Sequence, residues 1–130
     1  MPTVLLVDDV AQIRDIVTMF LNDEGFQVVA FGSCEDALLH LEANVPDVAI
    51  LDGRLPGMSG WECLERLRAD ARTAQLPVVM LTAAPRDAQR YLAGEPDVCT
   101  RCLDKPFDLD RLLDAINEVT TACQSPLVSA

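Results

Sequence analysis

Five short, mostly apolar runs along the chain are each followed by a stretch whose apolar residues recur at helical spacing. Such runs are typical of strands that are covered on both faces of a parallel sheet. We expect strands at residues 3–7, 27–31, 48–51, 78–81 and 101–103. The third run leads directly into Asp52 and the fourth into Thr82, so both polar residues are expected at strand ends.

Helices are predicted between these strands and after the last one. The apolar stripes cover residues 10–21, 37–41, 61–67, 86–93 and 109–119. Gly25 stands where the first helix would end, and Ser33 is placed to cap the start of the second. Gly94, Glu95 and Pro96 would end the short fourth helix.

The regular alternation of strands and helices predicts an α/β fold. Right-handed crossovers favour a doubly wound, five-stranded parallel sheet in the flavodoxin-like order 2-1-3-4-5, with helices on both faces. We expect one domain over residues 1–122. Residues 123–130 are expected to form a C-terminal tail or the stub of a linker.

The charge of the chain argues against two classes of partner. Its 21 acidic and 10 basic residues give a net charge of −11, which would repel phosphate backbones and anionic lipid surfaces. We therefore expect neither direct nucleic-acid binding nor membrane association. No apolar run approaches the roughly 20 residues of a membrane span, and the N-terminus does not resemble a signal peptide. A cytoplasmic location is expected.

Five cysteines occur, and reduced thiols are their expected state in that compartment. Cys99 and Cys102 form a C-x-x-C pattern, which raises a redox or zinc role. One such pair is a weak signal, because a closed zinc site needs four ligands. We interpret the cysteines as ordinary small side chains.

Polar residues that could bind a metal ion or take part in a reaction follow four of the predicted strands. Asp8, Asp9, Asp52, Thr82 and Lys105 should meet at one sheet edge, where ligands bind in open α/β sheets. Three crowded carboxylates repel one another unless a cation is present, and oxygen ligands suit Mg²⁺. A carboxylate beside Mg²⁺ can attack phosphorus, with a hydroxyl and an ammonium group to bind the phosphoryl oxygens. Taken singly, each residue could be a solvated acid, a cap or a surface lysine.

The sequence motifs at these positions resemble those of receiver domains of two-component response regulators (CheY-like). The motifs are L-V-D-D, A-I-L-D-G-R-L-P-G-M-S-G, V-V-M-L-T-A and L-D-K-P-F, and they span about residues 3–122. The resemblance implies Asp52 as phosphoacceptor and a Mg²⁺ site made by Asp8, Asp9, Asp52 and the backbone carbonyl of Arg54.

The same resemblance implies further roles around the phosphoacceptor. Thr82 would be the switch hydroxyl, Lys105 the cation that pairs with the phosphoryl group, and Lys105-Pro106 a cis-prolyl bond. Arg54 and Ala84 occupy positions that tune phosphoryl lifetime in the family.

One departure from the family pattern concerns the switch. Cys102 stands three residues before Lys105, where the family usually has an aromatic residue. Backbone shifts or another side chain, such as Tyr91, would then have to transmit the signal. The segment between Thr82 and Lys105 is also about one residue longer than usual.

The function implied is that of a phosphorelay response regulator that is not an enzyme. A sensor histidine kinase or phosphotransfer protein would donate the phosphoryl group, and an unidentified downstream protein would receive the signal. A monomer or weak homodimer is expected. A haloacid-dehalogenase-like phosphatase is disfavoured, because Arg54 replaces the general acid required two residues after the nucleophile. A degenerate receiver that is never phosphorylated stays open because of Cys102.

Overall fold

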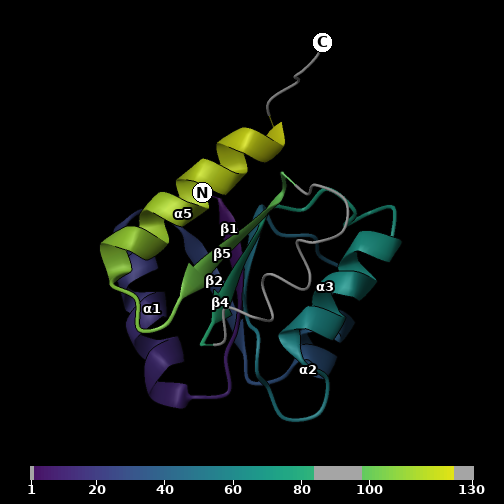
Figure 1. Ribbon diagram of the computed structural model, residues 1–130, viewed down its shortest axis with the longest axis horizontal. Coiled ribbons are helices and arrows are strands. Elements are labelled where there is room, and N and C mark those ends of the chain that lie inside the picture. Colours follow the sequence, from purple (N-terminus) through teal and green to yellow (C-terminus); the bar gives the residue numbers. More distant parts are fainter. Residues whose placement is uncertain (1, 84–97, 125–130) are drawn as a thin grey trace.

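The computed structural model describes residues 2–83 and 98–124 (Figure 1). Strands and helices alternate along this part of the chain as the apolar pattern predicts. The elements are β1 (Thr3–Val7), α1 (Ala11–Asp23), β2 (Gln27–Phe31), α2 (Cys34–Leu41), β3 (Val48–Asp52), α3 (Gly60–Ala69), β4 (Val78–Thr82), β5 (Thr100–Asp104) and α5 (Leu109–Gln124). The helix expected over residues 86–93 lies outside the described residues.

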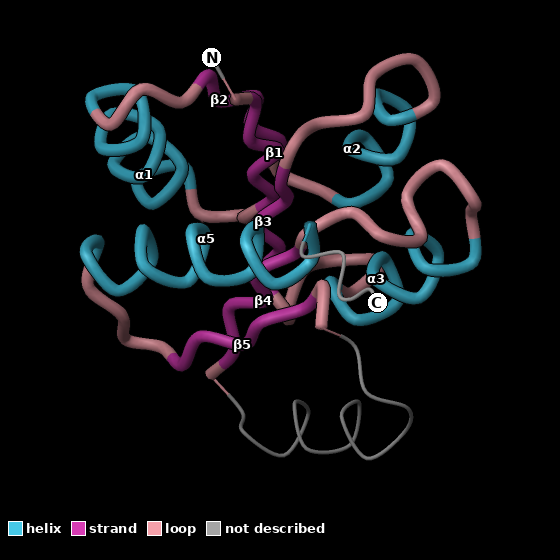
Figure 2. The backbone as a smooth tube through the Cα atoms, turned by 90° about the horizontal axis from the view of Figure 1, so that it is seen from above, coloured by secondary structure: helices cyan, strands magenta, loops and turns pink. Residues whose placement is uncertain are grey.

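The five strands form one parallel sheet in the order β2-β1-β3-β4-β5, which confirms the predicted fold. Seen from above, α1 and α5 cover one face of the sheet and α2 and α3 cover the other (Figure 2). The register places Asp52 beside Leu81 and Thr82 beside Asp104. The functional residues at strand ends are therefore brought to one edge.

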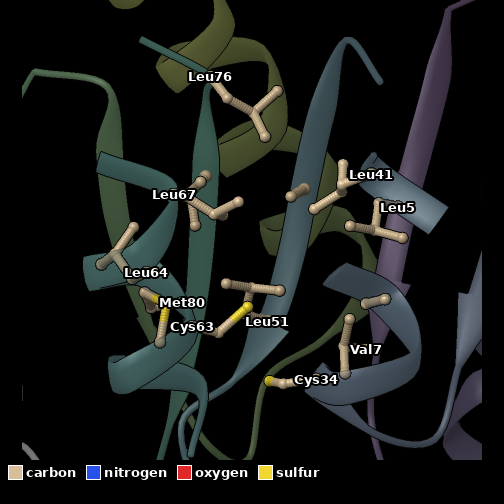
Figure 3. Close-up of a cluster of buried hydrophobic side chains, with 13 residues drawn as sticks. Leu5, Val7, Cys34, Leu41, Leu51, Cys63, Leu64, Leu67, Leu76 and Met80 are labelled. Carbon is tan, nitrogen blue, oxygen red and sulfur yellow. The ribbon is translucent and has the colours of Figure 1, made fainter. Parts of the chain in front are cut away.

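Alternate side chains of each strand enter two separate hydrophobic cores. Leu5 and Val7 of β1 pack on the side of α2 and α3, together with Leu51, Leu64 and Met80 (Figure 3). The intervening strand residues pack against α1 and α5 on the opposite face; they include Val4, Leu6, Ile50, Val79 and Leu81. Because strand side chains alternate between faces, continuous apolar runs fill both cores.

Local polar groups fix where the helices begin and end. The hydroxyl of Ser33 accepts a hydrogen bond from the backbone N–H of Asp36, as expected of an N-cap. Ser59 and Glu62 form a capping box at the start of α3. Gly25 follows α1 with a φ of +96°, a conformation that glycine adopts at no steric cost.

Several strand and helix bounds differ slightly from the sequence expectation. Asp52 is itself the last residue of β3, and β5 extends one residue further at each end than expected. Helix α5 continues to Gln124, beyond the boundary expected at residue 122. Among residues 2–83 and 98–124, no helix combines the length and apolarity needed to cross a bilayer.

The cysteines differ from the expected state. Cys99 and Cys123 form a disulfide with a Cα–Cα distance of 4.6 Å, so the prediction of reduced thiols is wrong for these two residues. Cys34, Cys63 and Cys102 are free thiols. The bridge does not use the C-x-x-C pair, because the helix α5 brings a cysteine from 24 residues away to Cys99.

Candidate functional site

Asp8, Asp9 and Asp52 converge at the carboxyl ends of β1 and β3. One carboxylate oxygen from each of them lies within 4.8 Å of the others. Thr82 ends β4 and Lys105 follows β5 at the same edge. The parallel sheet thus brings together all five residues that the sequence singles out.

Asp52 is held by a cation and by the loop that follows it. The ammonium nitrogen of Lys105 donates to Oδ2 of Asp52 at 2.8 Å, and the backbone N–H of Arg54 donates to Oδ1 at 3.1 Å. The side chain of Asp52 is only 6% exposed, whereas that of Lys105 is 26% exposed. Both carboxylate oxygens are therefore fixed in direction, and the carboxylate is shielded from bulk water while the lysine stays partly exposed.

Asp8 is fully buried and incompletely paired. Its Oδ1 accepts from the backbone N–H of Val10 at 2.8 Å, whereas its Oδ2 is buried without a hydrogen-bond partner among the described residues. Burial raises the pKa of Asp8; the negative charges of Asp52 and Asp9 act in the same direction, against the Val10 amide and Lys105. A buried carboxylate oxygen of this kind requires a counter-charge.

A divalent cation with oxygen ligands fits this arrangement. The orphaned Oδ2 of Asp8 and the neighbouring carboxylates of Asp9 and Asp52 offer hard oxygen donors in one place. The described residues place neither a thiolate nor an imidazole in the cluster, which favours Mg²⁺ over softer metals.

Arg14 supports the site from α1, and sequence reasoning missed it. Its Nη1 donates to the backbone carbonyl of Asp8 at 2.6 Å. The contact fixes the peptide that joins Asp8 to Asp9 and adds positive charge beside the acidic cluster. The target is a backbone oxygen, so the spacing of charged side chains could not have indicated it.

Two glycines allow α3 to begin directly against the end of β3. The backbone N–H of Gly60 donates to the carbonyl of Gly53 at 3.2 Å. A Cβ at position 60 would overlap the carbonyl oxygen of Asp52, and a Cβ at position 53 would lie 2.8 Å from the indole nitrogen of Trp61. The end of β3 at Asp52 thus packs directly against the start of α3, and this close approach depends on the absence of a side chain at positions 53 and 60.

Thr82 and Lys105 are joined through the backbone. Thr82 is 3% exposed, and its carbonyl accepts from the backbone N–H of Lys105 at 2.8 Å. The Lys105-Pro106 bond is cis. The half-buried Cys102 packs against the core on the side of α2 and α3, and burial raises the pKa of its thiol. Ala84 and Tyr91 lie outside the described residues.

An apolar groove of about 570 Å³ lies beside the acidic cluster, between α1 and residues 105–109. Ile13, Ile16 and Phe107 line it, and the side chain of Lys105 belongs to its wall. Ile16 and the nearby Met19 are exposed by 55% and 68%. The site therefore has an acidic side and an apolar side.

Solved structures share this fold over nearly the whole chain. The chemotaxis protein CheY4 of Vibrio cholerae is 33% identical with a TM-score of 0.81, over 92% of this chain and 98% of that one. A putative response regulator from Chloroflexus aurantiacus is 30% identical with a TM-score of 0.81, over 92% and 98% of the two chains.

Sequence relatives are longer proteins. The response regulator Rre1 of Synechocystis is 39% identical over 85% of this chain and 48% of its own length. The heme response regulator HssR of Staphylococcus saprophyticus is 38% identical over 92% of this chain and 51% of its own length. The chain thus spans about half the length of these relatives. The family profile "Response regulator receiver domain" matches residues 4–117, and this chain belongs to that family of two-component signalling domains.

Proposed function

We propose that Asp52 accepts a phosphoryl group from a histidine-phosphorylated protein, a sensor kinase or a phosphotransfer protein. The observation that carries the proposal is the 2.8 Å contact between Lys105 and Asp52, inside a cluster of three carboxylates. A shielded carboxylate beside a fixed ammonium group and a cation site is suited to phosphoryl transfer. Two-component partners of this kind act in the cytoplasm, where we place the domain.

Asp8, Asp9, the carboxylate of Asp52 and the backbone carbonyl of Arg54 would hold Mg²⁺. When bound, the ion supplies positive charge that neutralises the oxygens of the transferring group. An oxygen of Asp52 forms the new bond to phosphorus, and the bond from phosphorus to the donor imidazole breaks with its electron pair. Lys105 then pairs with a phosphoryl oxygen, and the hydroxyl of Thr82 donates to another.

The signal would leave the site through the backbone link between β4 and β5. The N–H of Lys105 donates to the carbonyl of Thr82, so displacement of either residue toward a phosphoryl group moves both strand ends. Cys102 has no aromatic ring, so it cannot make the side-chain rotation that the family pattern implies at this position. Output to a downstream protein would therefore follow displacement of β5 and its neighbours, in a monomer or weak homodimer.

We infer a signalling role rather than catalytic turnover. Arg54 stands two residues after Asp52, where a phosphatase with an aspartyl nucleophile needs a general acid. Its cationic side chain cannot protonate a leaving group in that way, because arginine keeps its proton. Arg54 would instead affect how long the phosphoryl group persists, as would Ala84.

The test is covalent labelling by acetyl phosphate with Mg²⁺, followed by intact mass and peptide mapping. The expected result is one added phosphoryl group on Asp52, absent in Asp52→Asn and retained in Asp23→Asn, which changes an exposed aspartate far from the cluster. Wild-type protein that gains no group, or gains it elsewhere, would overturn the proposal. Rapid multiple turnover of phosphomonoesters would identify an enzyme instead.

A further inference from the structure

The disulfide lies at the end of the sheet opposite to Asp52. It joins Cys99, which precedes β5, to Cys123 in the last turn of α5. In Figure 1 the end of α5 lies beside the start of β5, whereas the strand arrowheads point to the other edge. The bridge is therefore separate from the acidic cluster, and a role for the bridge does not rest on the proposed function.

We propose that Cys99 and Cys123 form a reversible redox site, oxidised by small disulfides of the glutathione class and reduced by small thiols. The surroundings of Cys123 can accommodate both states. Its Sγ lies 2.8 Å from the backbone carbonyl of Gln75, which can accept a hydrogen bond from the thiol once the bridge is reduced. Reduction therefore does not leave the thiol of Cys123 without an acceptor.

Cys99 is held in place independently of the bridge. Its carbonyl accepts from the backbone N–H of Val78 at 2.8 Å and from Nη2 of Arg68 at 3.0 Å. The Arg68 guanidinium also donates to the carbonyls of Thr73 and Leu76. The backbone of Cys99 is thus held by these hydrogen bonds whether or not the bridge is present. Breaking the bridge therefore removes a constraint mainly from Cys123.

That other partner is the end of α5. Helix α5 is anchored by Leu112, Ile116 and Val119, which are buried in the core shared with α1. Beyond Val119 the next residues are partly or fully exposed, and the bridge is the covalent attachment there. Reduction is therefore expected to release the last turn of α5 and to leave the remainder of the helix packed.

The other thiols are poor competitors for oxidation. Cys34 and Cys63 are fully buried in the core of Figure 3, so an oxidant in solution reaches neither thiol, although their mutual hydrogen bond raises the pKa of Cys34 and lowers that of Cys63. Burial also raises the pKa of Cys102. Cys34 and Cys63 should stay reduced because they are inaccessible, and Cys102 because the reactive form is the thiolate, whereas Cys123 is partly exposed and can react.

The exchange balances in two steps. The thiolate of Cys123 attacks one sulfur of oxidised glutathione, so a mixed disulfide forms and one glutathione thiolate leaves. The thiolate of Cys99 then attacks the Cys123 sulfur and expels the second glutathione thiolate. The two electrons from the cysteines end on the two glutathione molecules, which take up the two protons that the thiols released.

The experiment compares the protein in buffers of oxidised and of reduced glutathione, with alkylation and peptide mapping. We expect Cys99 linked to Cys123 in the first buffer and both alkylated in the second. Reduction should lower the Tm on the order of 10 °C, because the bridge constrains the unfolded chain. Cys102→Ser is the matched control and should keep both responses.

Cys99→Ser and Cys123→Ser should lose the dependence of Tm on reductant and melt near the reduced wild-type protein. Circular dichroism should show the loss of no more than about one helical turn on reduction. A bridge between Cys99 and Cys102, free Cys99 and Cys123 in the oxidising buffer, or a Tm that ignores reductant would each overturn the proposal. Wholesale loss of helix on reduction would contradict the local release of α5.

Discussion

The ammonium group of Lys105 and the carboxylate of Asp52 are in direct contact at 2.8 Å, although 53 positions separate them in the chain. Lys105 is also the only lysine of the sequence. The nine other basic residues are arginines, whose planar guanidinium groups do not act as compact point charges. The position next to Asp52 therefore depends on one side chain that no other residue of the chain can replace chemically.

Replacing Lys105 by Met should slow labelling of Asp52 by acetyl phosphate roughly 100-fold, since one preorganised charge on the transferring group is lost. Lys105→Arg keeps the charge but not its geometry, so an intermediate rate is expected. The measurement is the rate of phosphoprotein formation at saturating Mg²⁺. An unchanged rate in Lys105→Met would remove Lys105 from the chemistry.

Addition of Mg²⁺ should raise the melting temperature, because the ion binds the folded cluster and relieves carboxylate repulsion. At ten times the dissociation constant the linkage amounts to about 1.4 kcal/mol. That corresponds to a shift of about 5 °C for a domain of this size. Differential scanning calorimetry measures it, with KCl at matched ionic strength as the control. An equal shift in KCl would mean screening rather than site binding.

Asp8→Asn should stabilise the protein in EDTA at neutral pH by about 1 kcal/mol, a common size for one substitution. The pKa of Asp8 is raised in the folded state from its ordinary value of 3.8, so the folded protein holds the proton more tightly. Stability is consequently lost as pH rises through the window above 3.8, and the penalty is complete above the raised pKa. Asparagine removes that penalty but can still accept the bond from Val10.

Urea unfolding at neutral and acidic pH tests the Asp8 prediction. The gain in the free energy of unfolding should be present at pH 7 and should shrink toward pH 4. Asp23→Asn, on the exposed end of α1, is the control for removing one negative charge outside the cluster. If Asp8→Asn is instead less stable than the wild type in EDTA, the prediction is wrong. The protein itself would then offset the cost of burying the carboxylate without a metal ion.

Gly60→Ala should destabilise the protein by about 3 kcal/mol, because the new Cβ would overlap the carbonyl of Asp52. Either α3 or the end of β3 must move, so labelling of Asp52 should slow as well. Gly25→Ala is the informative comparison. It strains a positive φ with nothing within 4 Å, and should cost only about 1 kcal/mol while leaving labelling intact.

The sequence predicts most of the sheet and the site because the relevant signals are local. An apolar run that ends on Asp52 or Thr82 indicates a strand with a polar residue at its carboxyl end. Because all strands of the sheet are parallel, these ends lie together at one edge. The pairing of Cys99 with Cys123 has no such signal. It depends on the direction in which α5 crosses the sheet, whereas the nearby C-x-x-C pattern suggested a different association.

Contacts between side chains and the backbone likewise could not be predicted from the sequence. Arg14 binds the carbonyl of Asp8, and Gly60 packs against the carbonyl of Asp52. Every residue carries a carbonyl, so the pattern of side chains does not indicate which one an arginine will contact. The capping box of Ser59 and Glu62 could have been predicted, because its spacing is a recognised helix-start signal.

Trp61 gives the protein an internal optical reporter. It is the only tryptophan, and its indole ring packs against Gly53, the residue that follows Asp52. Any ion or phosphoryl group that changes the charge at Asp52 alters the field around that ring, so its fluorescence should respond without an attached dye. Stopped-flow emission could then follow site occupancy in real time, in the unmodified chain.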